Sequence, residues 1–211
     1  MPARPRVAAI ITIYRPLAHA DVIATKFMKG GSTDDGLVAP EADLVSMYID
    51  HVMEDDIGTA LGAEYNVPIY PSIRQALHAG GDQLGVDAVL LIGEHGDYPW
   101  NERGRHLYPR RYFFEQIAGV FAESGRSVPV FCDKHLSWNW DQAHDMVKTS
   151  HELDFPMFAG SSLPVCRRIP SVDMPWGAEV EEIQRRLRMA REMGGPDKVG
   201  KQTAKGKLTA R

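Results

Sequence analysis

The sequence predicts a doubly wound α/β domain with a mostly parallel sheet, and three observations support this. Short apolar runs rich in β-branched residues alternate with longer segments that have helical periodicity. The runs are hydrophobic throughout, which is typical of strands buried on both faces of a parallel sheet. Glycine, proline or a helix-capping residue separates most of the segments. Strands and helices that alternate in this way form a parallel sheet covered by helices on both faces.

The expected strands are the apolar runs, the first of which reads RVAAIITIY over residues 6–14. The others are residues 44–49, 68–70, 87–92, 128–132 and 156–159. Helices are expected at residues 19–28, 56–65, 72–80, 110–122 and 140–153, where apolar residues recur every three or four positions. Ser72 is placed to cap one helix, and Gly30 and Gly31 end another. Residues 94–109 are expected to form a long irregular loop, and the whole pattern predicts a Rossmann-like domain.

The C-terminal part of the chain differs from the rest in composition. We expect the α/β domain to occupy residues 1–177 and a second segment to occupy residues 178–211. Within that segment, residues 179–193 have the composition of a charged helix, and the residues after them are polar and basic. Such a tail lacks apolar periodicity, which predicts disorder.

Composition limits the class of protein and its partners. The 211 residues are 44% hydrophobic and 25% charged, as in ordinary soluble domains. A net charge of -4 gives no general attraction to nucleic acid or to anionic lipid. The two cysteines have no metal-ligand or redox spacing, and the first apolar run is too short for a signal peptide or a membrane span. We therefore expect a cytoplasmic protein with a small-molecule substrate.

Five of the apolar runs end, on the C-terminal side, in a group of ionisable or hydroxyl residues. The groups are Tyr14, Arg15, His19 and Asp21; Asp50 and His51; Glu94, His95 and Asp97; Asp133, Lys134 and His135; and Ser161 and Ser162. In open α/β sheets, ligands bind outside the carboxyl ends of the strands. The sequence therefore predicts that these groups meet at one binding site.

Four stretches of the chain resemble the N-terminal domain of the Gfo/Idh/MocA family of NAD(P)-dependent sugar and inositol dehydrogenases. They are the first strand, residues 60–70 (ALGAEYNVPIY), residues 85–92 (GVDAVLLI), and residues 133–136 (DKHL). The last stretch stands in the place of the Glu-Lys-Pro-Leu of the family. The resemblance covers most of residues 6–165.

The resemblance implies an oxidoreductase that uses NAD or NADP and acts on a small sugar, polyol or hydroxy acid. It places Lys134 near the nicotinamide and the substrate hydroxyl, and we take His135 and His95 as further acid/base candidates. The candidate cofactor-binding residues are Tyr14, Arg15, His19, Asp50 and Glu94.

The chain departs from the family in the turn after the first strand. The family has glycines there, which allow the backbone to approach a pyrophosphate at a helix N-terminus. Residues 12–19 of this chain contain no glycine, so the side chains of Tyr14, Arg15 and His19 are expected to take that space. Arg15 is still suited to pairing with a phosphate. The second, substrate-binding domain of the family has no counterpart in these 211 residues.

Two other functions remain open on the sequence. One is a metal- or acid/base-dependent lyase or hydrolase that uses the fold without a nucleotide. In this case Glu94, His95 and Asp97, with His19, His106 and His135, offer nitrogen and oxygen ligands to a divalent metal, although their spacing matches no strong signature and we assign no metal ligand. The other is a non-catalytic binding domain that forms a homo-oligomer through its charged tail helix. Fold class alone does not separate these functions.

Overall fold

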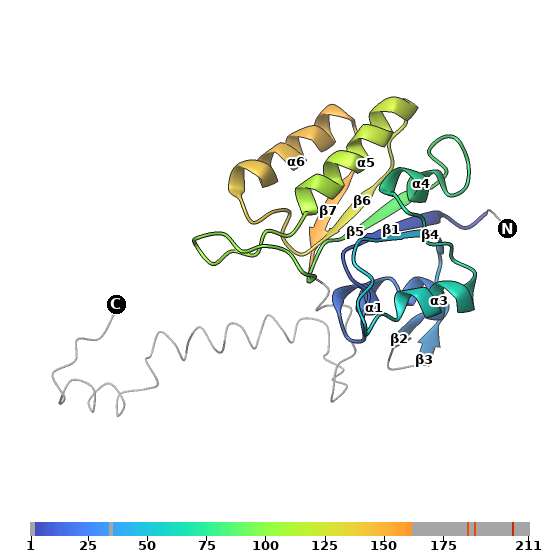
Figure 1. Ribbon diagram of the computed structural model, residues 1–211, viewed down its shortest axis with the longest axis horizontal. Helices are drawn as coiled ribbons and strands as arrows, with labels where there is room; N and C mark the ends of the chain where they lie inside the picture. The colour runs from blue at the N-terminus through green and yellow to red at the C-terminus, as the bar shows by residue number, and fades with distance from the viewer. Residues whose placement is uncertain (1–2, 34–35, 162–184, 186–187, 189–203, 205–211) are drawn as a thin grey trace. The chain divides into compact units, whose positions relative to one another are not determined.

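A five-stranded parallel sheet forms the centre of the structure, a computed structural model that describes residues 3–33, 36–161, 185, 188 and 204. The strand order is β4-β1-β5-β6-β7, and every neighbouring pair is parallel (Figure 1). The strands are β1 (Arg6–Ile11), β4 (Asp43–Ile49), β5 (Ala88–Ile92), β6 (Val130–Asp133) and β7 (Met157–Gly160). The predicted α/β fold class is confirmed.

The sheet has a topological switch point between β1 and β5. The chain moves outward from β1 to β4, and a sixth short segment then pairs with the outer edge of β4. Met47 forms a parallel bridge with Ile69 there, so the predicted strand at residues 68–70 is present as a single bridge. The chain then returns to β5 on the other side of β1. This is the strand order of Rossmann-type domains, in which ligands bind at the switch point.

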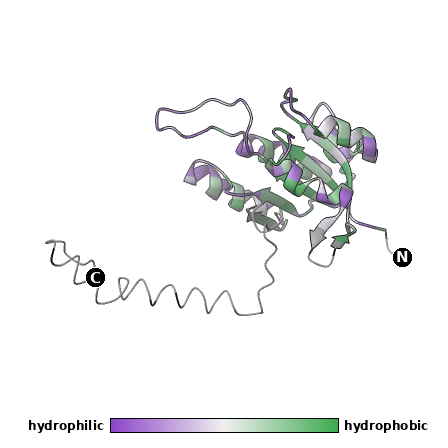
Figure 2. Ribbon diagram, turned by 90° about the horizontal axis from the view of Figure 1, so that it is seen from below, coloured by the Kyte–Doolittle hydropathy of each residue, from purple (hydrophilic) through white to green (hydrophobic). Residues whose placement is uncertain are grey.

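Helices cover both faces of the sheet. Helices α4 (Ile73–His78), α5 (Arg110–Ser124) and α6 (Trp140–Glu152) lie on one face, and α1 (His19–Ile23) and α3 (Gly58–Tyr65) lie on the other (Figure 1). Each face has its own apolar core, and β1 contributes to both because its side chains alternate. Ala8 and Ile10 face α4 and α5, whereas Ala9 and Ile11 face α1 and α3. Hydrophobic residues gather in the strands (Figure 2).

The segment predicted as one helix at residues 19–28 is two short helices. Helix α2 (Lys26–Lys29) follows α1 after a turn in which the N–H groups of Phe27 and Met28 bond to the carbonyls three residues back. Thr25 lies at this turn, and its hydroxyl is held by Tyr14 and Asp21. These side-chain bonds compete with a continuous helix at this point.

An antiparallel hairpin that the sequence did not predict follows α2. Its strands are β2 (Gly31–Thr33) and β3 (Gly36–Val38), and three residue pairs join them. Gly30 precedes the hairpin with φ of 89°, a left-handed conformation that favours glycine. Strands of three residues are too short to show a periodic pattern in the sequence.

The chain divides into a compact unit over Met1–Arg167 and a second unit over Arg168–Arg211. The predicted charged helix and basic tail fall almost wholly outside the described residues. Within the part of the chain that the structure describes, no helix has the length and apolar character needed to cross a membrane.

Candidate active site at the carboxyl edge of the sheet

The turn that follows β1 sends one of its predicted site residues into the core and leaves another exposed. The Tyr14 side chain is 1% exposed, and its hydroxyl hydrogen-bonds to that of Thr25 at 2.7 Å. Burial raises the pKa of Tyr14, so the phenol stays protonated. Tyr14 therefore stabilises the turn from within the core, and its side chain does not reach the carboxyl edge of the sheet. Arg15 is exposed, and Leu17, two residues later, has φ of 61°.

His19 connects the turn after β1 with the end of β6. It is the first residue of α1, and its Nδ1 lies 2.5 Å from Oδ2 of Asp133. Asp133 is fully buried, and a carboxylate only accepts hydrogen bonds, so Nδ1 of His19 is the donor. The His19 ring also meets the ring of His95 edge-on, with the centroids 5.2 Å apart. Residues that follow β1, β5 and β6 therefore come together here.

Glu94 joins two cations at the end of β5. Its carboxylate accepts hydrogen bonds from Nζ of Lys134 at 3.2 Å and from the guanidinium of Arg110. Lys134 is 38% exposed, whereas Arg110 is 1% exposed and lies over the ring of Tyr108 at 5.0 Å. The Nε and Nη1 atoms of Arg110 have no hydrogen-bond partner among the described residues.

Gly93 allows the start of α5 to lie this close to β5. A Cβ atom at Gly93 would stand 2.6 Å from Cγ of Arg110. In the sequence, Arg110 is one of four nearby arginines suited to a carboxylate or phosphate ligand, with Arg103, Arg105 and Arg111, and their pattern does not show that Arg110 is the buried one. The one feature of the sequence that indicates this close approach is Gly93, directly before Glu94.

Two of the site residues have strained backbones. His95 has φ of 65° and Lys134 has φ of 59°, both in the left-handed region. This conformation costs about 1–3 kcal/mol for a residue other than glycine, and it occurs often at functional sites. Neighbouring bonds hold it in place: the Thr12 hydroxyl donates to the carbonyl of Glu94 at 2.6 Å, and the Lys134 N–H donates to the carbonyl of Gly160.

The surroundings of His95 favour its neutral form. Burial lowers the pKa of His95, and the charges of His19, Arg15 and Lys134 lower it further, while Asp133 acts in the opposite direction. A neutral imidazole accepts a proton at neutral pH. His95 is therefore suited to act as a general base beside the ammonium group of Lys134. His135 lies exposed next to Lys134.

Asp50 forms a second group of contacts at the end of β4. Its two carboxylate oxygens accept hydrogen bonds from the hydroxyls of Tyr48 at 2.5 Å and of Tyr98 at 2.6 Å. The ring of Tyr98 also stacks on His51, with the centroids 4.7 Å apart. Tyr98 belongs to the irregular loop after β5, so the loop is attached to the end of β4.

Aromatic contacts organise the rest of that loop. His106 stacks on Trp100 at 4.1 Å between centroids and lies 4.2 Å from the ring of Tyr108. Its Nε2 atom is 2.8 Å from the carbonyl oxygen of Tyr98. His106 therefore supports the loop through contacts within it. Among the described residues, no group of three or more His, Cys, Asp or Glu residues is arranged to hold a metal ion. Nothing in that part of the chain supports the metal alternative.

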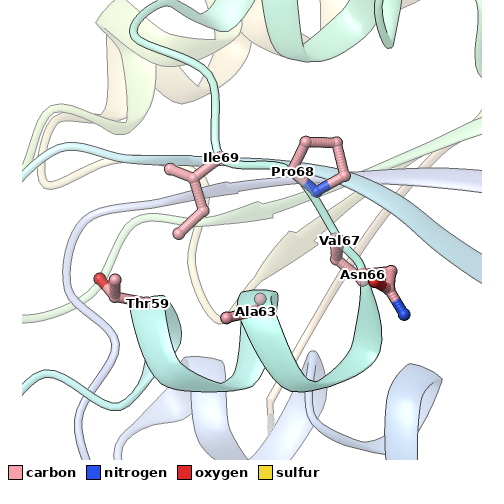
Figure 3. Close-up of a pocket in the computed structure, with 7 residues that line it drawn as sticks. Thr59, Ala63, Asn66, Val67, Pro68 and Ile69 are labelled. Atoms are coloured by element: carbon pink, nitrogen blue, oxygen red, sulfur yellow. The ribbon is translucent and has the colours of Figure 1, made fainter.

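A shallow hollow lies away from these residues, at the outer edge of the sheet (Figure 3). It has a volume of about 430 Å³ and lies between α3 and the segment that pairs with β4. Its lining residues are Thr59, Gly62, Ala63, Asn66, Val67, Pro68 and Ile69. None of them has an ionisable side chain, so the hollow offers no acid/base chemistry. Ser161 follows β7, and Ser162 is outside the described residues.

No protein-family model and no curated protein sequence matches this chain. Solved structures with a similar fold do exist. GenD2 from gentamicin A biosynthesis, in complex with NAD, shows 16% identity over 76% of this chain and 35% of its own, with a TM-score of 0.48. Biliverdin reductase from Synechocystis, in complex with biliverdin and NADP+, shows 13% identity over 73% of this chain and 37% of its own, with a TM-score of 0.44.

A probable dehydrogenase from Thermotoga maritima shows 18% identity over 73% of this chain and 35% of its own, with a TM-score of 0.44. The match with this chain thus spans about a third of the length of each of these proteins. At such identities and TM-scores the likeness adds nothing to the fold that the strand pairing itself shows. The strand order and the parallel pairing make this chain a Rossmann-type α/β protein.

Proposed function

We propose that this protein is an acid–base enzyme on a dehydrogenase-type Rossmann domain, and that its substrate is a small polyhydroxylated acid. The proposal rests on one observation, the convergence of His19, His95 and Lys134 from three strand ends. The carboxylates of Asp133 and Glu94 are buried and hold His19 and Lys134 in position, while His95 lies edge-on against His19.

The groups divide into a base, a charge that stabilises an oxyanion, and an acid. The neutral imidazole of His95 takes a proton from the carbon next to the substrate carboxylate. Lys134 stabilises the negative charge that then develops on oxygen, as fixed cations do in enolate chemistry. His19, oriented by Asp133, returns a proton to a hydroxyl on the neighbouring carbon, which leaves as water. The bond to that hydroxyl breaks and a carbon–carbon double bond forms, so the step needs no oxidant.

The charges at the edge favour an anionic substrate among the sugars, polyols and hydroxy acids that the family resemblance implies. The positive charges of Lys134 and of the exposed Arg15 both lower the pKa of His95. Together they outweigh the negative charge of Asp133, which raises it. A positive local field attracts a carboxylate. A hydroxy acid, such as an acid derived from a sugar, combines that carboxylate with the required hydroxyl.

A second candidate is the NAD(P)-dependent dehydrogenase that the sequence resemblance implies. The strand order with its switch point and the exposed Arg15 in the turn after β1 favour it. In that candidate the same edge of the sheet would bind the substrate hydroxyl. The homo-oligomer and the cytoplasmic location stay predictions.

Deuterium exchange tests the proposal directly. The full chain is incubated in D2O with a panel of sugar-derived and other hydroxy acids, without nucleotide, and proton NMR follows the C–H signal next to the carboxylate. We expect wild-type protein to remove that signal from at least one acid. Lys134→Met should slow the exchange by about a hundredfold or more, the usual scale of such catalytic groups.

Lys148→Met is the matched control, because Lys148 is 65% exposed on α6 and pairs with Glu152 on the same helix. It should exchange at the wild-type rate. Failure of every acid to exchange with wild-type protein, or equal rates for Lys134→Met and Lys148→Met, would contradict the proposal.

A further inference from the structure

Two contacts between side chains cross the carboxyl edge of the sheet. The first joins Tyr98 to Asp50, at 2.6 Å between the hydroxyl and Oδ2. Tyr98 follows β5 and Asp50 follows β4, and β1 lies between these strands. The contact therefore passes over the end of β1. The ring of Tyr98 also stacks on the ring of His51, with the centroids 4.7 Å apart, which attaches the loop at a second point.

The second contact joins His19 to Asp133, at 2.5 Å between Nδ1 and Oδ2. His19 follows β1 and Asp133 ends β6, and β5 lies between these strands. The contact therefore passes over the end of β5, where the ring of His95 lies against His19. We call the two contacts the Tyr98 bridge and the His19 bridge.

The bridges lie on the line that a dinucleotide follows in this fold. An extended dinucleotide crosses the switch point between β1 and β5, with its pyrophosphate on the turn after the first strand and a carboxylate at the end of the second strand on its ribose. Here that turn has no glycine, and Leu17 within it is left-handed and 89% exposed. The carboxylate in the ribose position is Asp50, and each of its oxygens already accepts a hydrogen bond from a tyrosine.

The Tyr98 bridge does not open by titration near neutral pH. Burial raises the pKa of Tyr98, and the hydrogen bond to Asp50 raises it further. The phenol therefore remains a hydrogen-bond donor to Asp50 at neutral pH. These residues do not fit a dinucleotide in the arrangement that the structure shows.

We infer that the two bridges close the dinucleotide crevice of this fold, and that the protein works on its small substrate without NAD or NADP. The inference goes beyond the proposed acid–base chemistry and decides against the dehydrogenase candidate. It assigns the bridging residues Tyr98 and His19 a second role, which is to exclude the nucleotide.

Titration of the full chain with NADH and NADPH, each to millimolar concentration, tests the inference. Tryptophan fluorescence and calorimetry report binding. We expect no saturable binding to the wild-type protein. The triple variant Leu17→Gly, His19→Ala and Tyr98→Phe removes both bridges and places glycine at the left-handed position of the turn. It should gain affinity by at least about tenfold, enough to show saturation.

A matched triple variant makes the same kinds of change elsewhere: Ala79→Gly at another left-handed residue, His151→Ala at an exposed position, and Tyr65→Phe at the end of α3. It should bind no better than wild type, and cooperative thermal unfolding shows that each variant is folded. Saturable binding to wild type overturns the inference. So does a bridge-free variant that is folded and gains no affinity, because the bridges would then not be the obstacle. The nucleotide-free deuterium exchange is read separately, so the acid–base proposal stands or fails on its own.

Discussion

Glu94 is buried at the end of β5, and its carboxylate binds the two cations Lys134 and Arg110. Taking charges out of water is costly, and a buried pair offsets that cost only through close contact and further hydrogen bonds. Arg110, which is 1% exposed, therefore depends on Glu94 for its charge to be tolerated. A site residue and a residue needed for stability are here the same side chain.

Replacement of Glu94 by glutamine should destabilise the fold strongly. The change leaves the buried Arg110 guanidinium without the carboxylate that is hydrogen-bonded to it, a loss of about 3–5 kcal/mol in the free energy of unfolding. Urea denaturation measures it. Glu123→Gln is the control, because Glu123 pairs with Arg74 on the surface, where ion pairs contribute little. Equal losses in the free energy of unfolding for Glu94→Gln and Glu123→Gln would show that the buried pair of Glu94 and Arg110 does not stabilise the fold.

The pH dependence of stability should report the environment of His95. Its pKa in the folded protein lies below the ordinary value of 6.5, because of burial and the charges around it. As the pH falls through 6.5, the unfolded chain binds the proton first, so the free energy of unfolding decreases until the pH passes the folded pKa. Urea denaturation at neutral and mildly acidic pH measures this decrease in the free energy of unfolding. In the His95→Gln variant, the part of the decrease that comes from His95 should be absent. The control variant His151→Gln changes an exposed residue and should keep the full decrease. Identical curves of unfolding free energy against pH for His95→Gln and wild type would contradict a lowered pKa of His95.

Among the elements, α3 depends on a glycine for its position. A Cβ atom at Gly58 would stand 2.7 Å from Cδ1 of Ile49 and 2.7 Å from Cδ1 of Tyr14. Gly58 therefore lets α3 lie directly on β4 and on the buried ring that supports the turn after β1. The turn that carries Arg15 and His19 rests on this contact.

Gly58→Ala should lower the free energy of unfolding by about 1–3 kcal/mol, the usual cost of overfilling a core. Gly119→Ala is the matched change in α5, where a Cβ atom meets nothing within 4 Å. It should raise stability by about 0.5–1 kcal/mol, because alanine is the better helix former. Urea denaturation of both variants measures the difference, and a Gly58→Ala variant as stable as Gly119→Ala would refute the close approach.

The elements also show what the sequence could and could not predict. Buried strands such as β1 and β5 were predictable because both of their faces are apolar. The break between α1 and α2 was not, because it depends on where the Thr25 hydroxyl finds its partners. The groups at the strand ends were predictable as a set, since parallel strands share an edge. The pairing of His19 with Asp133 was not, because spacing along the chain carries no information about contacts 114 residues apart.

At the scale of the whole molecule, the order of the strands creates the site. Because β1, β5 and β6 are adjacent and parallel, the residues after them meet at one edge. Two apolar cores, one on each face of the sheet, hold the strands in register beneath those residues. The rigid sheet therefore positions the side chains of the candidate site, which lie at the strand ends and on the loops that follow them.

The most direct test of the acid–base account is the rate of water loss catalysed by Asp133→Asn, measured by NMR as formation of the dehydrated product. Asparagine keeps the shape and a hydrogen bond to Nδ1 of His19 but removes the buried charge that orients the imidazole, a change that lowers the rate by orders of magnitude in a Ser-His-Asp triad. Because His19 is the acid that protonates the leaving hydroxyl, we expect water loss at least about a hundredfold slower than in wild type, with substrate binding by saturation-transfer NMR retained and the surface variant Asp145→Asn unaffected. Water loss at the wild-type rate by Asp133→Asn would contradict the account.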